Sequence, residues 1–247
     1  MTEITNKDVC VVIPIYKDNI NNPLLYDEVE SIINTILKLK DNDIYFLHHP
    51  DLNISFYNIF KKYNNVHFIT YNYKTREEYS NMCLSYKFYE MFNKYKYMLI
   101  CQTDAYIFRN ELLYWCNKGY DYIGAIGLFT KITYPYQGKW DDENVGPIES
   151  YPHIVMNGGF SLRNIKSMYD FCFNNKDKFE KETFNEDCVI CWYHWNELNM
   201  PPYEEAIKFS AENQTYAFYP KYRDTLPFGC HTRKTKYKLL NIFKNKI

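Results

Sequence analysis

Asp104 is the residue whose setting most clearly suggests chemistry, because it follows an apolar run in the segment Leu99-Ile100-Cys101-Gln102-Thr103-Asp104. A carboxylate just after a buried strand is well placed to hold a hard divalent cation that bridges a diphosphate. Mg²⁺ and Mn²⁺ are such cations, and both favour oxygen ligands. An Asp in this position can equally cap a turn or a helix. Taken alone, Asp104 fits either interpretation.

The segment Asn185-Glu186-Asp187 is a second candidate, because it opens an apolar helical run. Asn185 can cap that helix, and the two carboxylates fall in its first turn, where the helix dipole favours negative charge. A carboxylate fixed there and facing a pocket could also be a general base that takes a proton from a hydroxyl group. We assign that role to Asp187, with a purely structural cap as the alternative.

Two further segments place polar side chains close to glycine. We predict a tight turn at Asn157-Gly158-Gly159 that leads into the strand Phe160 to Arg163. Its glycines permit close backbone approach, and its Asn side chain can hydrogen-bond a sugar hydroxyl; a plain hairpin turn is the alternative. His231 lies near the end of the chain, where a neutral imidazole could complete a metal site begun by Asp104. A buried structural histidine is the alternative there.

Composition argues against several classes of function. The 29 Lys and Arg residues balance 30 Asp and Glu residues, so nothing in the overall charge indicates a nucleic acid partner. Gly-rich phosphate loops of the P-loop or dinucleotide kind are absent. No signal peptide or bilayer-spanning apolar stretch is recognisable, so we expect a cytoplasmic protein with reduced cysteines. The pair Cys188 and Cys191 is then expected to be core rather than a zinc or redox site.

The elements that must position these residues alternate in the first hundred positions. Runs rich in β-branched and aromatic residues predict strands at Val9 to Ile15, Ile44 to Leu47, Val66 to Tyr71 and Tyr97 to Cys101. Helical spacing between them predicts helices over Val29 to Leu37, Phe56 to Tyr63 and Tyr79 to Tyr89. This alternation predicts an α/β fold with a doubly wound, mostly parallel sheet.

The carboxyl ends of parallel strands share one edge of the sheet, and ligands bind there. The first predicted strand delivers Pro14 and Tyr16 to that edge, and the fourth delivers Gln102 and Asp104. We therefore expect these four side chains to lie close together.

After Asp104 the regular alternation of predicted strands and helices ends. We predict the following elements: a helix at Glu111 to Asn117, a strand at Tyr122 to Ala125, a long irregular stretch from Ile126 to His153, the strand Phe160 to Arg163, and helices at Ile165 to Phe173 and Asp187 to Leu198. An irregular stretch of this length is usually a functional loop. We expect a single domain over 1–247, with residues 1–125 and 126–232 as its two halves.

The segment from Arg233 to Ile247 holds six basic residues and no acid, with four apolar residues among them. A basic amphipathic helix of this kind could rest on an anionic membrane surface. A solvated tail is the alternative. We therefore predict possible peripheral membrane contact for residues 233–247.

Taken in order, these segments resemble a family of GT-A-like glycosyltransferases that is catalogued as a domain of unknown function. The resemblance covers most of the chain. It runs through Val12-Ile13-Pro14, Arg76-Glu77-Glu78-Tyr79, Lys87-Phe88-Tyr89, Leu99 to Asp104, Tyr120 to Ala125, Asn157 to Arg163, Asn185-Glu186-Asp187, Pro201 to Ala206 and Pro227 to His231.

What the resemblance implies is a nucleotide-sugar donor, with a UDP-sugar favoured, bound at the ends of the first and fourth strands. The donor would be contacted by Pro14, Tyr16, Arg76 and Gln102-Thr103-Asp104, the last lying where GT-A enzymes carry Asp-x-Asp. Gln102 replaces the first Asp of that pattern. A Mn²⁺ or Mg²⁺ site would therefore need His231 as a ligand beside Asp104.

The resemblance also implies the catalytic half of the site. Asp187 maps onto the base of inverting GT-A enzymes, which deprotonates the acceptor hydroxyl for in-line attack on the anomeric carbon. Asn157, Gly158, Gly159 and Glu186 would contact substrate, and Arg163 or Arg76 could add positive charge at the leaving diphosphate. The acceptor would be a glycan or glycoconjugate, selected by the stretch from Ile126 to His153.

Two alternatives remain open at this point. A sugar nucleotidyltransferase would share the nucleotide-binding sheet, but it expects a Gly-rich basic loop after the first strand, where this chain has Pro14-Ile15-Tyr16-Lys17-Asp18. A non-catalytic protein that binds carbohydrate or nucleotide-sugar is the other, because Gln102 removes one expected carboxylate.

Overall fold

The computed structural model describes residues 3–18, 21–126, 156–180, 185–212, 219–221 and 223–244. Within these ranges one nine-stranded sheet runs through the molecule in the order β3-β2-β1-β4-β7-β6-β8-β9-β5. Its strands are β1 (Val9–Pro14), β2 (Asp43–His48), β3 (Val66–Thr70), β4 (Tyr97–Cys101), β5 (Tyr106–Ile107), β6 (Tyr122–Ile126), β7 (Met156–Asn164), β8 (Ser210–Ala211) and β9 (Gly229–Cys230).

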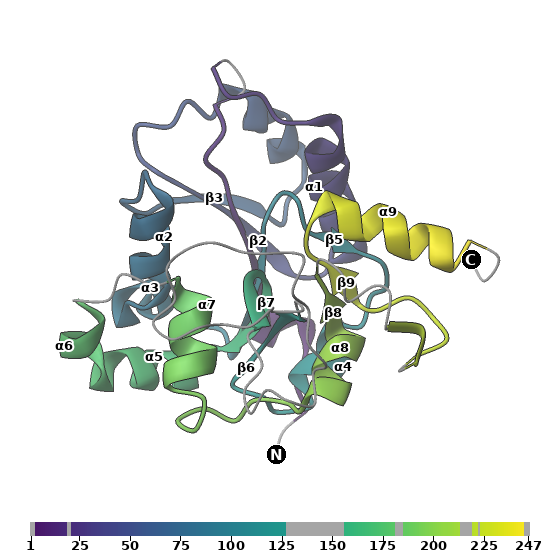
Figure 1. The fold of residues 1–247 in the computed structure, drawn as a ribbon. Helices are drawn as coiled ribbons and strands as arrows, with labels where there is room; N and C mark the ends of the chain where they lie inside the picture. Colours follow the sequence, from purple (N-terminus) through teal and green to yellow (C-terminus); the bar gives the residue numbers. More distant parts are fainter. Residues whose placement is uncertain are drawn as a thin grey trace.

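Helices gather on two sides of this sheet, with α2, α3, α5, α6 and α7 on the left of Figure 1 and α1 and α9 on the right. The described helices are α1 (Tyr26–Lys38), α2 (Arg76–Cys83), α3 (Tyr86–Glu90), α4 (Leu112–Cys116), α5 (Ile165–Asn174), α6 (Lys176–Phe179), α7 (Glu186–Cys188), α8 (Tyr203–Phe209) and α9 (Arg233–Ile242). The predicted α/β class with a mostly parallel sheet is confirmed.

The centre of the sheet is apolar on both faces. Every residue of β1 and β4 is buried, which explains why both strands are continuous apolar runs rather than alternating ones. β1 pairs in parallel with β2 and with β4, and β2 pairs in parallel with β3. All four strands predicted in the first hundred residues are therefore present, in doubly wound order.

The register of these strands builds a single functional edge. Val12 of β1 pairs with Ile100 of β4, so the two parallel strands end at the same edge of the sheet. This register brings Pro14 alongside Gln102. β7 runs antiparallel to β4, with Cys101 opposite Phe160, and the Gln102 amide donates to the Gly159 carbonyl at 2.8 Å. Because β7 runs antiparallel to β4, the amino-terminal end of β7 lies at this edge.

The prediction of a tight turn at Asn157-Gly158-Gly159 is therefore wrong. These residues lie inside β7, which begins at Met156, and Asn157 pairs with Ala125 of β6. The register shifts between Gly124 and Ala125, and a side chain at Gly124 would collide with the backbone of Met156 and Asn157. The glycines adapt a strand to a bulge and to the side chains around it.

Three predicted helices differ from the observed ones. The stretch from Tyr79 to Tyr89 breaks at Leu84 and Ser85 into α2 and α3. The segment Ser55–Lys62 is a 3₁₀ helix rather than an α-helix. The helix expected over Asp187 to Leu198 is only one α-helical turn, α7, followed by a π-helical turn at Val189–Tyr193.

The C-terminal helix α9 packs against the body of the protein. Leu239 and Phe243 are buried, while Ile242 is exposed. The Lys236 ammonium lies 2.7 Å from a Glu30 carboxylate oxygen on α1, and Arg233 pairs with Asp27 at the start of the same helix. Two of the four apolar residues behind the predicted membrane contact thus face inward, and the contact itself stays a prediction.

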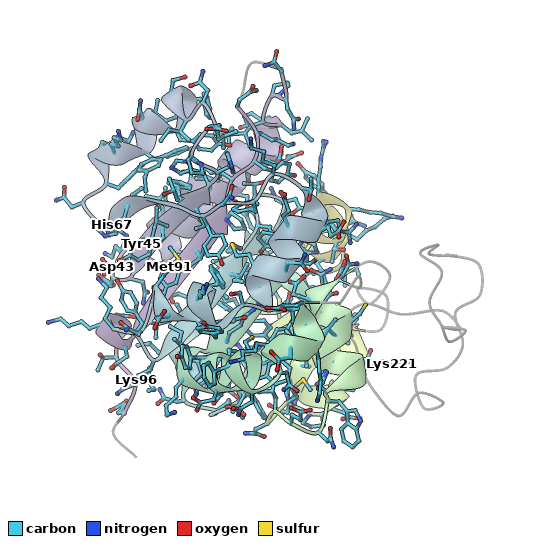
Figure 2. The ribbon with its side chains drawn as sticks, turned by 90° about the vertical axis from the view of Figure 1, so that its left-hand side faces the viewer. Asp43, Tyr45, His67, Met91, Lys96 and Lys221 are labelled. Atoms are coloured by element: carbon cyan, nitrogen blue, oxygen red, sulfur yellow. The ribbon has the colours of Figure 1, made fainter. Side chains whose placement is uncertain are left out.

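Two further features lie away from this edge. Asp43, Tyr45 and His67 gather at the β2–β3 side of the molecule in Figure 2, where Asp43 accepts a hydrogen bond from His67 at 3.1 Å. Asp43 begins β2, so this cluster lies toward the amino ends of the strands. Within the described ranges, no helix combines the length and apolar character needed to cross a bilayer. The predicted acceptor stretch, Ile126 to His153, lies outside the described residues except for Ile126.

Candidate active site at the carboxyl edge of the sheet

A cavity of about 420 Å³ opens at the carboxyl edge of β1 and β4. It brings together ten of the twelve site residues predicted from the sequence: Pro14, Tyr16, Arg76, Gln102, Asn157, Gly158, Gly159, Glu186, Asp187 and His231. These residues come from both halves of the chain and meet because β7, α7 and β9 all approach the ends of β1 and β4.

The other two predicted residues lie beside this cavity. Asp104 borders a neighbouring cavity of about 350 Å³, and Tyr16 lines both. Thr103 is buried, and its hydroxyl donates to Glu28 at 2.8 Å. Thr103 thus anchors the strand end to α1, while Asp104 on its far side turns toward His231.

His231 is held between carboxylates from two strand ends. β8 and β9 pair in parallel, so Glu212 and His231, which follow them, are neighbours; the His231 amide donates to the Ala211 carbonyl at 3.0 Å. Nδ1 of His231 lies 3.4 Å from Glu212 Oε1, and Nε2 lies 3.4 Å from Asp104 Oδ1. The same Nε2 is 3.3 Å from Gln102 Oε1.

These contacts decide the charge of the imidazole. Burial alone lowers the pKa of His231, but the carboxylates of Glu212 and Asp104 outweigh burial and raise that pKa to about 10. Burial also opposes ionisation of Asp104, yet the contact with His231 lowers the Asp104 pKa overall. In the protein without a metal these contacts favour the protonated imidazole, whereas the predicted role of His231 as a metal ligand needs the neutral form.

The residues around Nε2 of His231 fit a divalent metal ion by their chemistry. A carboxylate oxygen, an amide oxygen and an imidazole nitrogen converge there, from Asp104, Gln102 and His231, and Mn²⁺ accepts all three donor types. Nowhere in the described part of the chain do three or more His, Cys, Asp or Glu side chains form a metal-binding group. The amide of Gln102 would therefore have to act as a ligand, and His231 would have to release a proton.

Asp187 has the electrostatic setting expected of a base. Burial raises its pKa most, the carboxylates of Glu186 and Glu212 raise it further, and the result is about 7. The backbone N–H of Cys188 donates to Asp187 Oδ1 at 2.8 Å and limits the rise. A carboxylate whose pKa lies near neutrality is ionised for part of the time and can still accept a proton effectively.

Glu186, next to Asp187, is committed to structure. The fully buried Arg163 on β7 donates to Glu186 Oε1 at 3.2 Å, and Ser80 on α2 donates to Oε2 at 3.2 Å. Arg163 also donates to Ser161 Oγ and to the Tyr89 hydroxyl. The Arg163–Glu186 ion pair and the hydrogen bond from Ser80 thus connect α7 to β7 and α2. Arg163, which we considered for the leaving diphosphate, is enclosed, whereas Arg76 lines the cavity.

The side chain of Asn185, predicted to cap this helix, makes no capping hydrogen bond, although its backbone occupies the N-cap position of α7. Asn157 is likewise engaged within the protein: its Oδ1 accepts from the Gly159 amide at 2.6 Å and its Nδ2 donates to Glu212 at 3.3 Å. Asn157 thus connects β7 to Glu212, while Asn185 lines the cavity without capping the helix.

The two glycines of β7 line the cavity and leave room for the side chains around them. A Cβ on Gly158 would overlap the carboxylate of Glu186, and one on Gly159 would overlap His231 and Gln102. Because Gly159 has no side chain, His231 and Gln102 have room to contact each other.

Several cavity residues escaped the sequence analysis. Glu212 follows a strand of only two residues, too short to give a recognisable pattern. Tyr73, Lys74 and Tyr79 line the same cavity from the connection after β3 and from α2. Tyr79 lies on a predicted helix and within the segment Arg76-Glu77-Glu78-Tyr79 that resembles the family, which was the available signal, but the sequence analysis gave it no role in the site.

The chain matches one protein family and several solved structures. The profile of the family described as "Protein of unknown function (DUF5672)" matches residues 62–231. The chain belongs to this family. The match spans the strand end at Asp104, the glycines of β7, Asp187 and His231, so the family's region contains most of the candidate site. The comparison with curated proteins finds no match.

Solved structures show that this DUF5672 chain has the fold of GT-A glycosyltransferases. The galactosyltransferase LgtC, in complex with donor and acceptor sugar analogs, is similar over 96% of this chain and 99% of its own, with TM-score 0.53 and 14% identity. Mouse xyloside xylosyltransferase 1 is similar over 91% of this chain and 98% of its own, with TM-score 0.50 and 8% identity.

A third structure belongs to a different class of enzyme. The 4-diphosphocytidyl-2C-methyl-D-erythritol synthase of Anaerococcus prevotii is similar over 75% of this chain and 82% of its own, with TM-score 0.50 and 12% identity. At such identities these likenesses show the fold alone.

Proposed function

We propose that this protein is a glycosyltransferase that moves a sugar from a nucleotide-sugar donor, with a UDP-sugar favoured, to a hydroxyl of a glycan or glycoconjugate acceptor. The observation that carries the proposal is Asp187, a carboxylate with a pKa of about 7 in the same cavity as the strand-end residues Pro14, Tyr16 and Gln102. That arrangement combines a base with a place for a nucleotide on the fold of a glycosyltransferase.

The donor half of the proposal rests on charge and position. Arg76 lines the cavity as a cation suited to phosphate oxygens. Lys74 lines it as well, with its ammonium 2.9 Å from an Asp51 carboxylate oxygen at the surface. Tyr16, with 56% of its surface exposed, presents a ring at the end of β1. Asp104, His231 and Gln102 would hold the Mn²⁺ or Mg²⁺ ion. When bound, such an ion would neutralise charge on the leaving diphosphate.

The catalytic half follows from Asp187. Its carboxylate takes the proton of the acceptor hydroxyl, and the hydroxyl oxygen forms a bond to the anomeric carbon while the bond from that carbon to the diphosphate oxygen breaks. The nucleoside diphosphate leaves with the electron pair, and the anomeric configuration inverts. The buried Glu186–Arg163 pair holds the first turn of α7, and so the backbone of Asp187, in place.

The nucleotidyltransferase alternative has one supporting observation, the structural likeness to the diphosphocytidyl-methylerythritol synthase. The segment after β1 argues against it, because Pro14-Ile15-Tyr16-Lys17-Asp18 contains no glycine to wrap a triphosphate. The ammonium of Lys17 is also engaged, at 2.6 Å from Glu28. We therefore favour transfer of the sugar over transfer of the nucleotide.

The test is donor hydrolysis. The protein is incubated with UDP-, GDP-, CMP- and dTDP-sugars and Mn²⁺, and release of the free nucleotide is measured. We expect release from one nucleotide class that is lost in Asp104→Ala and retained in the surface control Asp170→Asn. Absence of both turnover and metal-dependent nucleotide binding would overturn the proposal. A product that retains the anomeric configuration would refute the role of Asp187 as base.

A further inference from the structure

We propose that the transferred sugar is uncharged, and that Glu212 makes the site reject sugars that carry a carboxylate. The inference rests on the proposed function. Glu212 is a buried residue at the end of β8, and its Oε1 lies 3.3 Å from Asn157 Nδ2 and 3.4 Å from His231 Nδ1. It shares the cavity with Asp187, so two carboxylates from different elements border the reaction centre.

The geometry of the reaction places the sugar near these carboxylates. A base must lie within hydrogen-bond distance of the acceptor hydroxyl, and that oxygen must approach the anomeric carbon to about 3–3.5 Å. The transferred sugar therefore lies within about one ring width of Asp187. Burial raises the pKa of Asp187 most, and the further rise caused by Glu186 and Glu212 is consistent with a negative potential at this end of the cavity.

The cations in and beside this cavity already have partners or roles. The proposed function assigns Arg76 to the phosphates, and Lys74 pairs with Asp51 at the surface. Arg163 and His231 contact carboxylates of the protein. Arg163 is fully buried and donates to Glu186, Ser161 and Tyr89. His231 lies between Glu212 and Asp104. Recognition of a sugar carboxylate normally uses an Arg or Lys that can pair with it. Arg163 cannot turn to one without losing Glu186, and His231 is held by Glu212 and Asp104 and would be a metal ligand.

The size of the effect follows from Coulomb's law. At an effective dielectric constant of about 20, two like charges about 8 Å apart repel strongly enough to lower an affinity by about tenfold or more. Neutral hydroxyls meet no such repulsion, and carboxylate and amide oxygens accept their hydrogen bonds. A neutral hexose or an N-acetylated sugar therefore fits this end of the cavity, and a uronic acid does not.

The experiment compares donors that differ only in that charge. The matched pair is UDP-glucose and UDP-glucuronate, or the equivalent sugars on whichever nucleotide the donor assay identifies. The affinity of each donor is measured by calorimetry in the presence of Mn²⁺. The affinity of the free nucleoside diphosphate is measured in the same way. We expect the neutral sugar to bind at least about tenfold more tightly. Glu212→Gln should shrink this ratio severalfold, while Asp170→Asn, an exposed acid on α5, should leave it unchanged.

The free nucleoside diphosphate separates the possible failures. Equal affinity for the two sugars in the unaltered protein, with the diphosphate bound normally, overturns the inference and leaves the proposed function standing. An unchanged ratio in Glu212→Gln, with normal diphosphate binding, overturns the role of Glu212. If no nucleotide binds to the unaltered protein, the proposed function fails and the inference fails with it.

Discussion

Replacing Asp187 by Asn should separate catalysis, donor binding and stability in a single variant. The substitution keeps the size and the hydrogen bond from the Cys188 amide, since Asn Oδ1 also accepts, but it removes the negative charge and the base. We expect the turnover number to fall by about 10²–10⁴-fold, the range for loss of a general base. Metal-dependent donor affinity should change little, because the base acts only in the chemical step.

The same variant should be more stable than the unaltered protein at neutral pH. The folded-state pKa of Asp187 is about 7 against the usual 3.8, so the folded state binds more protons than the unfolded state between these values. Stability therefore falls as pH rises from about 4 to 7. At about 1.4 kcal/mol per pKa unit, the full difference is at most about 4 kcal/mol. We expect a gain of about 2 kcal/mol in Asp187→Asn, since Glu186 and Glu212 share in the effect.

Urea unfolding at pH 7.5 and pH 5 measures this gain directly. It should be largest at pH 7.5 and shrink toward pH 5, where Asp187 is already protonated in the folded protein. Turnover of the unaltered enzyme should rise about tenfold per pH unit below pH 7 and level off above it. Asp170→Asn serves as the matched surface control. A variant that is less stable at both pH values, or that loses donor affinity with its activity, would refute the placement of Asp187 as a half-buried base.

The remaining predictions concern the residues that hold the site together. Arg163→Met should lower the free energy of unfolding by about 3–5 kcal/mol, because it leaves the Glu186 carboxylate buried beside a neutral side chain; urea unfolding should also show a smaller loss in the Arg163→Met/Glu186→Gln double variant. Gly159→Ala should reduce turnover more than tenfold in the donor hydrolysis assay, because its Cβ displaces His231 and Gln102. Gly119→Ala, at φ +76° with open space around it, should lose about 1 kcal/mol of stability and keep full turnover.

Much of the fold was predictable because its core strands are locally encoded. β1 and β4 are buried on both faces, so their apolar runs stand out in the sequence, and the alternation with α1 and α2 indicates parallel pairing. The strand β7 was only partly recognised. Its start at Asn157-Gly158-Gly159 resembles a turn, and only pairing with β4 and β6 makes it extended.

The short elements were beyond prediction for a similar reason. The two-residue strands β8 and β9 have no pattern of their own and exist because they pair with each other and with β6 and β5. Glu212 follows one of these strands, which is why it was missed. The helix at Asp187 was predicted too long, because an apolar run with helical spacing does not reveal that its backbone turns π-helical after Cys188.

Asp104 and Asp187 show what each level of information decided. Their types, and their positions after a buried strand and at a helix start, are properties of the sequence alone. Only the tertiary structure decided their charges and partners. The pKa of Asp187 depends on Glu212, 25 positions away, and that of His231 on Asp104, 127 positions away. Electrostatic interactions act through space and burial, and neither can be read from the order of residues along the chain.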